Sequence, residues 1–412
     1  MDLNHELGLR QNWQQFSLLV LINGFVGAMV GLERSIFPSF ANERFGVESA
    51  TAILSFILAF GFAKAIGNYL TGRMMNSLGR KKVLLLGWTL ALPIPWLLIW
   101  APSWNWVVAT NILLGLSQGF SWSATIVMKI DLVGPKHRGL AMGLNEFAGY
   151  FSVGIMAFIT GYVANRFGVY PYPFYIGAGI AIVGWMSSAL WVKETHQFAV
   201  KESQDDPNEP LTNVFKETTF THKTLSTVTQ AGLVNNLNDG MIWGLFPLLL
   251  LGLDFSLELV ALLSAIYPSV WGIGQLVTGK MSDHFNPKKL LLWGMLLQGV
   301  AILIVISTRE AMILGLLSAL LGLGTALVYP TFLHIIASHT RPLQRAESLG
   351  VFRLWRDLGY VFGALLSGIL ADVFGLKVAI FGVGLLTLAS AGIIALRMPN
   401  TYKSSRSPSE AT

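Results

Sequence analysis

"TGRMMNSLGRKKVLLLG" (residues 71–87) returns 207 residues later as "TGKMSDHFNPKKLLLWG" (residues 278–294). The same offset pairs "LLGL" at 113–116 with "LLGL" at 320–323, and "GYVANRFG" at 161–168 with "GILADVFG" at 368–375. Apolar helices resemble one another by chance at single places, but chance does not hold one register over so long a distance. The pattern therefore indicates an internal duplication.

The composition around these repeats is that of a membrane protein. Hydrophobic residues make up 53% of the chain and charged residues only 12%, whereas a soluble domain carries about 25% charged residues. A spanning helix needs about 20 mostly apolar residues. Twelve segments meet that requirement, near 15–38, 49–75, 82–101, 105–130, 139–165, 171–192, 226–252, 258–282, 288–306, 311–337, 346–373 and 377–397. The sequence predicts an all-α integral membrane protein with twelve transmembrane helices in two pseudo-symmetric six-helix bundles.

One long polar stretch divides the chain. It runs from Lys193 to about Lys223 and contains "KESQDDPNEP" (201–210), a composition typical of an exposed linker. We expect a first six-helix bundle over 1–192, a linker over 193–223, a second bundle over 224–399 and a tail over 400–412.

The distribution of basic residues predicts the orientation. Most of the 28 Lys and Arg residues fall in the linker, at the termini and in the loops on their side, and the opposite loops hold only Arg44, Arg166, Arg309 and Lys377. The positive-inside rule places the linker and both termini on the cytoplasmic side of a cell membrane. The compact loops fit a bacterial inner membrane.

The loop after the second span of each half carries the motif G-x-x-x-D-x-x-G followed by two basic residues. In the first half its matching residues are Gly72, Gly79, Arg80 and Lys81; in the second half they are Gly279, Asp283, Lys288 and Lys289. With two six-helix halves and a linker between them, the whole chain resembles the major facilitator superfamily. The resemblance implies a monomer that transports by alternating access. It also implies that the first and fourth helices of each half line the cavity, the second and fifth flank it, and the third and sixth face lipid.

Two departures from the family pattern bear on function. Asn76 stands where the motif has Asp; in the family that carboxylate lies near a helix N-terminus and helps to hold the cytoplasmic side shut. The latch is therefore weaker here or is borne by Asp283. The fifth span also lacks the Gly-Pro signature of many drug/proton antiporters, which counts against a multidrug exporter.

Charged residues within the spans are the candidate site. A charge at the centre of a spanning helix costs about 2.5–3.5 kcal/mol, so it should face protein or water. In "VFRLWRDLGYVFG" (351–363), Arg353, Arg356 and Asp357 share one helix face, and Arg353 is spaced to pair with Asp357. Lys64 of the second span is expected to meet this face across the bundle interface. The resulting surplus of positive charge indicates an anion site, an interbundle salt bridge without substrate, or an element of proton coupling.

Carboxylates in other spans are candidate proton sites. Asp239 and Glu146 lead, because a carboxylate in a partly dry cavity can bind and release a proton near neutral pH. Asp239 could instead hold neighbouring Asn side chains. Glu33 and Arg34 lie near the end of the first span and point about 100° apart on the helix. One of them is expected in an outer gate or upper substrate site, and the sequence leaves open which.

Other polar and aromatic residues have simpler interpretations. Lys129 and Asp131 are expected at the membrane interface. His334 could be a proton relay, but a packed, neutral histidine is the simpler interpretation. Trp122, Trp243, Trp271 and Trp355 could stack on an aromatic substrate.

The sequence predicts a secondary active transporter of a small solute, coupled to protons or another ion, with a lean toward an organic or anionic solute. The first alternative is a multidrug/proton antiporter that exports amphipathic compounds. The second alternative is a membrane sensor without transport. No phosphate-binding loop, metal-ligand cluster or nucleophile triad stands out, so we expect no enzyme activity, cofactor or metal. The partners expected are the solute, the coupling ion and membrane lipid. Nucleic acid is not expected, because the basic residues are spread over short loops.

Overall fold

The computed structural model describes residues 6–34, 36–47, 50–204 and 208–400, and this part of the chain is helical without strands. The first half contains α1 (Trp13–Arg34), α2 (Phe37–Phe45), α3 (Ala50–Leu78), α4 (Arg80–Ala91), α5 (Ile94–Ile99), α6 (Trp104–Val133), the 3₁₀ turn η1 (Pro135–His137), α7 (Arg138–Phe167) and α8 (Tyr172–Leu190). The second half contains α11 (Lys223–Leu251), α12 (Leu257–His284), α13 (Pro287–Val305), α14 (Ala311–Ser338), α15 (Pro342–Phe374) and α16 (Leu376–Arg397). Between them lie α9 (His196–Glu202), α10 (Val214–Lys216) and the π-helical turn η2 (Glu217–Thr221).

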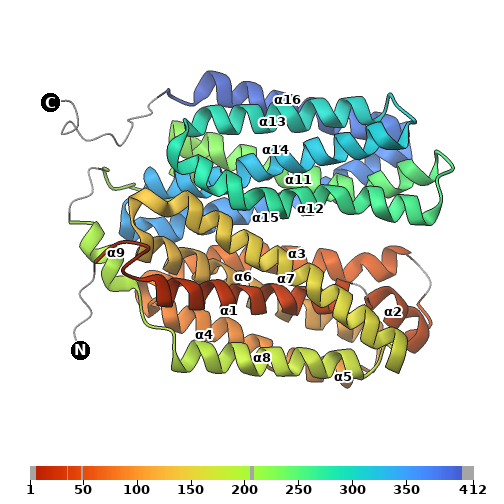
Figure 1. The fold of residues 1–412 in the computed structure, drawn as a ribbon, viewed down its shortest axis with the longest axis horizontal. Coiled ribbons are helices and arrows are strands. Elements are labelled where there is room, and N and C mark those ends of the chain that lie inside the picture. The colour runs from red at the N-terminus through yellow and green to blue at the C-terminus, as the bar shows by residue number, and fades with distance from the viewer. Residues whose placement is uncertain (1–5, 35, 48–49, 205–207, 401–412) are drawn as a thin grey trace.

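The long helices of each half run alongside one another in a bundle. Figure 1 shows the first half below and the second half above, with α9 at the end of the molecule where α1 begins and α16 ends. We call this end the linker end, and the opposite end, where α2 lies, the far end.

Within the described residues, eight helical stretches are long and apolar enough to cross a membrane by length and composition: α1, α4–α5, α7, α8, α13, α14, α15 and α16. The other four long helices, α3, α6, α11 and α12, bury polar side chains such as Asn68, Lys129, Asn235 and Gln275. Polar side chains are tolerated within a membrane bundle when, as here, they face protein.

The helix boundaries follow the predicted spans except at prolines. The first predicted span, 15–38, ends at Arg34, and a separate helix, α2, begins at Phe37 with Pro38 in its first turn. The third, 82–101, divides into α4 and α5 around Pro93. Proline has no backbone N–H to continue a helix but is tolerated in a first turn, so each of these helices begins there.

The linker is not the wholly exposed segment that its composition indicates. Phe198, Ala199 and Val214 are buried, and Glu202 at the end of α9 is bound by arginines of both halves. The linker has few apolar residues among many polar ones, so its average composition does not reveal that it contacts the bundle.

The two halves meet along two helix pairs, α3 with α15 and α7 with α12. Glycine permits both crossings. A Cβ atom at Gly72 would lie 2.6 Å from the Ala346 carbonyl oxygen, and one at Gly143 would lie 2.4 Å from that of Gln275. The offset of 207 relates Gly72 to Gly279 and Gly143 to Gly350, and Gly279 and Gly350 are equally confined. The duplicated sequence thus builds the same close crossing twice.

Candidate functional site

Six of the sequence-predicted residues come together at the middle of the bundle. Lys64 of α3 interacts electrostatically with Glu146 of α7 and with Arg353, Arg356 and Asp357 of α15. Asp239 of α11 interacts in the same way with Arg356 and Asp357. We call these six residues the central cluster. They are three cations and three carboxylates, so the surplus of positive charge expected from Lys64 and α15 alone is balanced by Glu146 and Asp239, which other helices bring in.

Asp357 links the two halves. Its Oδ1 accepts a hydrogen bond from Arg356 Nη1 at 3.1 Å, and its Oδ2 accepts one from Asn68 Nδ2 at 2.6 Å. Asp357 thus pairs with Arg356 rather than with Arg353, the partner that helix spacing suggested. The Arg356 guanidinium also lies over the Tyr329 ring, 4.1 Å from its centroid, an arrangement suited to arginine.

Several charged atoms of the cluster have no internal partner. Arg353 Nε and Nη1, Arg356 Nε and Nη2, and Glu146 Oε2 are buried without a hydrogen-bond partner among the described residues. Arg353 and Arg356 are each only 2% exposed. A buried donor left unsatisfied costs about 1–3 kcal/mol, and more when it is charged. These guanidinium groups therefore favour an additional acceptor.

Glu146 and Asp239 are each held by a neighbouring aromatic residue. Glu146 Oε1 accepts hydrogen bonds from Trp122 Nε1 at 3.0 Å and from Asn145 Nδ2 at 2.7 Å. Asp239 Oδ1 accepts a hydrogen bond from the Tyr267 hydroxyl. Asn235 and Asn238 donate instead to Gln298 Oε1, so Asp239 is not the centre of the asparagine network that was its alternative interpretation.

Aromatic rings cross the interface between the halves beside these charges. Trp122 lies 5.5 Å from Tyr150, and Tyr150 lies 4.4 Å from Trp271 of the second half, centroid to centroid. The Trp271 ring stacks with that of Tyr267 at 6.0 Å. Lys64 Nζ lies 5.2 Å from the centroid of the Trp122 ring.

Sequence reasoning missed Asn68, Tyr267 and Tyr329 as members of this site. The offset of 207 could have identified Tyr329, since it relates that residue to Trp122. It also relates Lys64 to Trp271 and Glu146 to Arg353. These equivalent positions of the duplicated sequence lie in one site, so a member from one half could have pointed to its counterpart in the other.

Glu33 lies apart from the halves' interface. Its side chain is 3% exposed and lines a cavity of about 10 Å³ with residues of α1, α3 and α6, all from the first half. Such a volume is close to the minimum for one water molecule. The side chain of Arg34 lies outside the described residues. Of the two candidates, the structure therefore describes only the side chain of Glu33, which faces protein.

At the linker end, Asp283 holds the start of α7. Its carboxylate accepts hydrogen bonds from the backbone N–H groups of Gly139 at 2.7 Å and Leu140 at 3.0 Å, a favourable position for an anion. His334 of α14 adds a contact, with Nδ1 at 3.3 Å from Asp283 Oδ1. Asn76, the equivalent residue of the first half, is exposed.

A second contact at the linker end involves three residues that we call the linker clamp: Arg138, Glu202 and Arg345. Arg345 binds Glu202 in a bidentate pair with N–O distances of 2.9 and 3.0 Å, and Arg138 Nη2 donates to the same carboxylate. Burial alone would raise the pKa of Glu202, but the guanidinium groups of Arg345 and Arg138 outweigh it and lower that pKa. The offset of 207 relates the two arginines, so one linker carboxylate joins equivalent positions of both halves.

The motif residues of the first half surround a buried ion pair. Arg80 Nε donates to Asp131 Oδ2 at 3.1 Å, and Gly79 turns the chain between α3 and α4 with φ of 88°. Lys81 Nζ and its counterpart Lys288 Nζ donate to the carbonyls of Ala189 and Ala395, near the ends of α8 and α16.

Asp131 and Lys129, predicted to lie at the membrane interface, are fully buried among helices, so their side chains face protein rather than water. Lys129 Nζ donates to the Leu19 carbonyl at 3.0 Å, and Asp131 binds Arg80. Neighbouring helices thus supply the partners that water would supply at an interface.

Comparisons with known proteins agree with this architecture. The chain matches the Major Facilitator Superfamily over residues 17–233 and 228–412. It is 22% identical to "Multidrug resistance protein MdtG" of Enterobacter lignolyticus, over 95% of this chain and 94% of that protein, and 25% identical to the protein of the same name from Serratia proteamaculans, over 92% and 93%.

Two solved structures share the fold. The human organic anion transporter MFSD10 (TETRAN) superposes with a TM-score of 0.74 at 16% identity, over 92% of this chain and 99% of that chain. The proton:xylose symporter XylE superposes with a TM-score of 0.71 at 14% identity, over 94% and 97%. The predicted all-α membrane fold is thereby confirmed, and the chain is a member of the major facilitator superfamily of multi-pass membrane transporters.

Proposed function

We propose that this protein is a proton-coupled secondary transporter of an organic anion, which binds between its two halves at Arg353 and Arg356. The observation that carries the proposal is the set of buried guanidinium N–H groups without an internal acceptor. Arginine presents its donors in a planar fork that matches a carboxylate or phosphate. The neighbouring rings of Tyr150 and Trp271 suit an organic group attached to that anion.

The charge balance of the central cluster supports proton coupling. With all six groups ionised the central cluster is neutral, and protonation of Asp239 or Glu146 leaves it net positive. Attraction between charges is strong in a partly dry site, so a bound proton favours a bound anion and the two move together. We further propose that the linker end faces the cytoplasm, as the distribution of basic residues predicts. The structure, closed there by the linker clamp and Asp283, then corresponds to the state shut to the cytoplasm.

Among the similar proteins, MFSD10 is named an organic anion transporter, which supports this substrate class. The MdtG relatives, named for multidrug resistance, favour a second candidate: export of amphipathic compounds bound by the aromatic rings. The two differ in whether a negative charge on the substrate is required.

Binding to the purified protein tests the anion site. We expect an aromatic carboxylate to bind, and its neutral amide to bind far more weakly. Arg353→Gln and Arg356→Gln should each weaken binding of the carboxylate by about 10–100-fold, the usual worth of a hydrogen bond to a charged group. Arg73→Gln is the matched control, because Arg73 is largely exposed and its nearest carboxylate, Glu347, lies 3.9 Å away. Equal binding of carboxylate and amide by all variants would favour the second candidate.

Transport in proteoliposomes tests the coupling. An imposed pH gradient should drive accumulation of the anion, and a protonophore should abolish it. Asp239→Asn removes one proton site but keeps the shape of the side chain, so it should permit exchange of anion while preventing accumulation. Accumulation that persists without the gradient contradicts proton coupling.

A further inference from the structure

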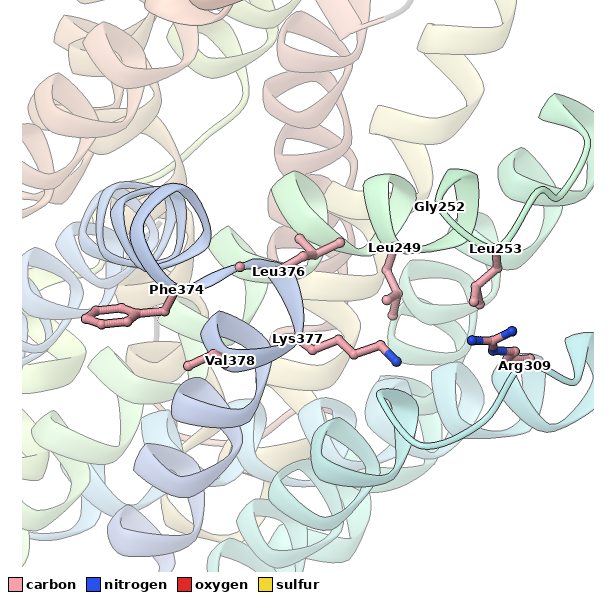
Figure 2. Close-up of a pocket in the computed structure, with 9 residues that line it drawn as sticks. Leu249, Gly252, Leu253, Arg309, Phe374, Leu376, Lys377 and Val378 are labelled. Atoms are coloured by element: carbon pink, nitrogen blue, oxygen red, sulfur yellow. The ribbon is translucent and has the colours of Figure 1, made fainter.

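A cavity of about 340 Å³ lies at the far end of the second half, outside the central cluster (Figure 2). It is formed where α11 ends, where the chain passes from α13 to α14, and where α15 gives way to α16. Leu249, Leu253, Leu376 and Val378 supply apolar walls. The two charged residues among those lining the cavity are Arg309 and Lys377.

The two cations face one another. Figure 2 shows the side chain of Lys377, at the start of α16, and that of Arg309, in the α13–α14 connection, pointing toward each other across the cavity, with Leu249 and Leu253 beside them. No carboxylate lines the cavity within the described part of the chain. Like charges repel at such a site, so an anion placed between them would stabilise both.

Arg309 and Lys377 occupy unusual positions in the sequence for basic residues. They are two of the four basic residues in the loops opposite the linker, where the positive-inside pattern otherwise excludes them. The other two have partners inside the protein: Arg44 lies over the Tyr170 ring, 3.9 Å from its centroid, and Arg166 donates to the Tyr162 hydroxyl at 3.0 Å. Arg309, in the α13–α14 connection, and Lys377, in the first turn of α16, instead converge on one cavity.

The surroundings of the cavity are lipid-facing. Val378 is 50% exposed, and Phe381 and Leu385 continue an exposed apolar surface along α16. Ile304, near the end of α13, is also exposed. A ligand of this site therefore needs an anionic group for the two cations and an apolar part for the walls and the helix surface.

We propose that this cavity binds an anionic phospholipid of the leaflet opposite the linker end. Its phosphate lies between Arg309 and Lys377, and an acyl chain follows the apolar surface of α16. The lipid ties the last turn of α11 to the α13–α14 and α15–α16 connections, three segments that the second half must keep together. The site is separate from the central cluster and does not depend on the proposed substrate.

Lipid binding to the purified full chain in detergent tests the proposal. Phosphatidylglycerol should raise the Tm and remain bound in native mass spectrometry, whereas phosphatidylcholine with the same acyl chains should do neither at equal concentration. The double variant Arg309→Gln/Lys377→Gln should lose the shift. Arg166→Gln, which removes a cation elsewhere on the same side, should keep it.

A second variant separates the cavity from its charges. Gly252 has a φ of −68° and a Cβ there would meet nothing closer than 3.4 Å, so Gly252→Trp can fill the cavity without strain in the backbone. It should fold and also lose the phosphatidylglycerol shift. Glycerol 3-phosphate tests the source of the phosphate: an equal shift with this soluble compound would overturn the lipid assignment in favour of a free anion. Retention of phosphatidylglycerol by both variants would overturn the site itself.

Discussion

The single residue Glu202 helps to hold the two halves together at the linker end. Its carboxylate is the shared acceptor of Arg138 and Arg345, which belong to different halves. Because the pKa of Glu202 is lowered from its ordinary value of 4.5, its charged form stabilises the closed linker end. That contribution is complete above the ordinary value and is lost as the pH falls through the lowered one.

We expect Glu202→Gln to weaken the closed linker end by about 1–3 kcal/mol, since the hydrogen bonds to the arginines lose their charge. The chain has no cysteine, so Ser282→Cys, at a buried position of the linker end, can report opening through its rate of maleimide labelling. Labelling should be faster in the Glu202→Gln background and unchanged with Glu209→Gln, an exposed linker glutamate.

The pH dependence gives an independent test of the clamp. Between about pH 5 and pH 8 the Glu202 carboxylate stays charged, so the clamp should be equally strong throughout that range once labelling is corrected for the thiolate fraction. A clamp that weakens between pH 6 and pH 7 would contradict the lowered pKa.

At the residue scale, sequence reasoning selected six residues that the fold brings together, because a buried charge in a spanning helix is rare and needs partners. It did not predict which of these residues form hydrogen-bonded pairs. Helix spacing favoured Arg353 as the partner of Asp357, but the partners of Asp357 are its neighbour Arg356 and Asn68 from the other half. A contact between halves cannot be read from the periodicity of one helix.

At the scale of elements, the crossings at glycine determine how closely the halves approach. Gly143 of α7 faces the backbone of α12, where an added Cβ would lie 2.4 Å from a carbonyl oxygen. Gly154, in the same helix, has no heavy atom within 4 Å of such a Cβ. The two glycines therefore differ in packing while sharing one helix.

Gly143→Ala should destabilise the protein by about 1–3 kcal/mol, the usual cost of overpacking, and should accelerate labelling of the linker-end cysteine. Gly154→Ala should be neutral or stabilising, because alanine favours a helix over glycine by about 1 kcal/mol. Thermal unfolding and the labelling rate measure the two effects. A similar loss of stability in both variants would assign the effect to helix propensity or lipid contact rather than to the crossing.

The elements themselves were largely predictable. Runs of about 20 apolar residues identified every long helix, since the bilayer demands that length. The exceptions were local: prolines divided two of the expected spans, and the linker folded back onto the bundle. Its short helix α9 owes its place to Glu202 and Phe198, whose partners are distant in sequence.

At the scale of the whole molecule, the orientation is open to direct measurement. In the cysteine-free chain, Ser307→Cys at the exposed α13–α14 connection should react with an impermeant maleimide in intact cells. Glu209→Cys in the linker should react only after the membrane is permeabilised. The reverse pattern would contradict the positive-inside assignment and invert the proposed state of the structure.

The sequence by itself determined the membrane class, the duplication and the helices, because the bilayer imposes length and apolar composition on each segment separately. It also singled out the charged residues within the spans as site candidates, since each is costly alone. Only the tertiary structure decided which partners the charged groups have: Asp357 has Asn68, Asp239 has Tyr267, and Glu202 has two arginines. These contacts join residues of different helices, and their geometry depends on how the two halves pack at the glycine crossings, which no single segment contains.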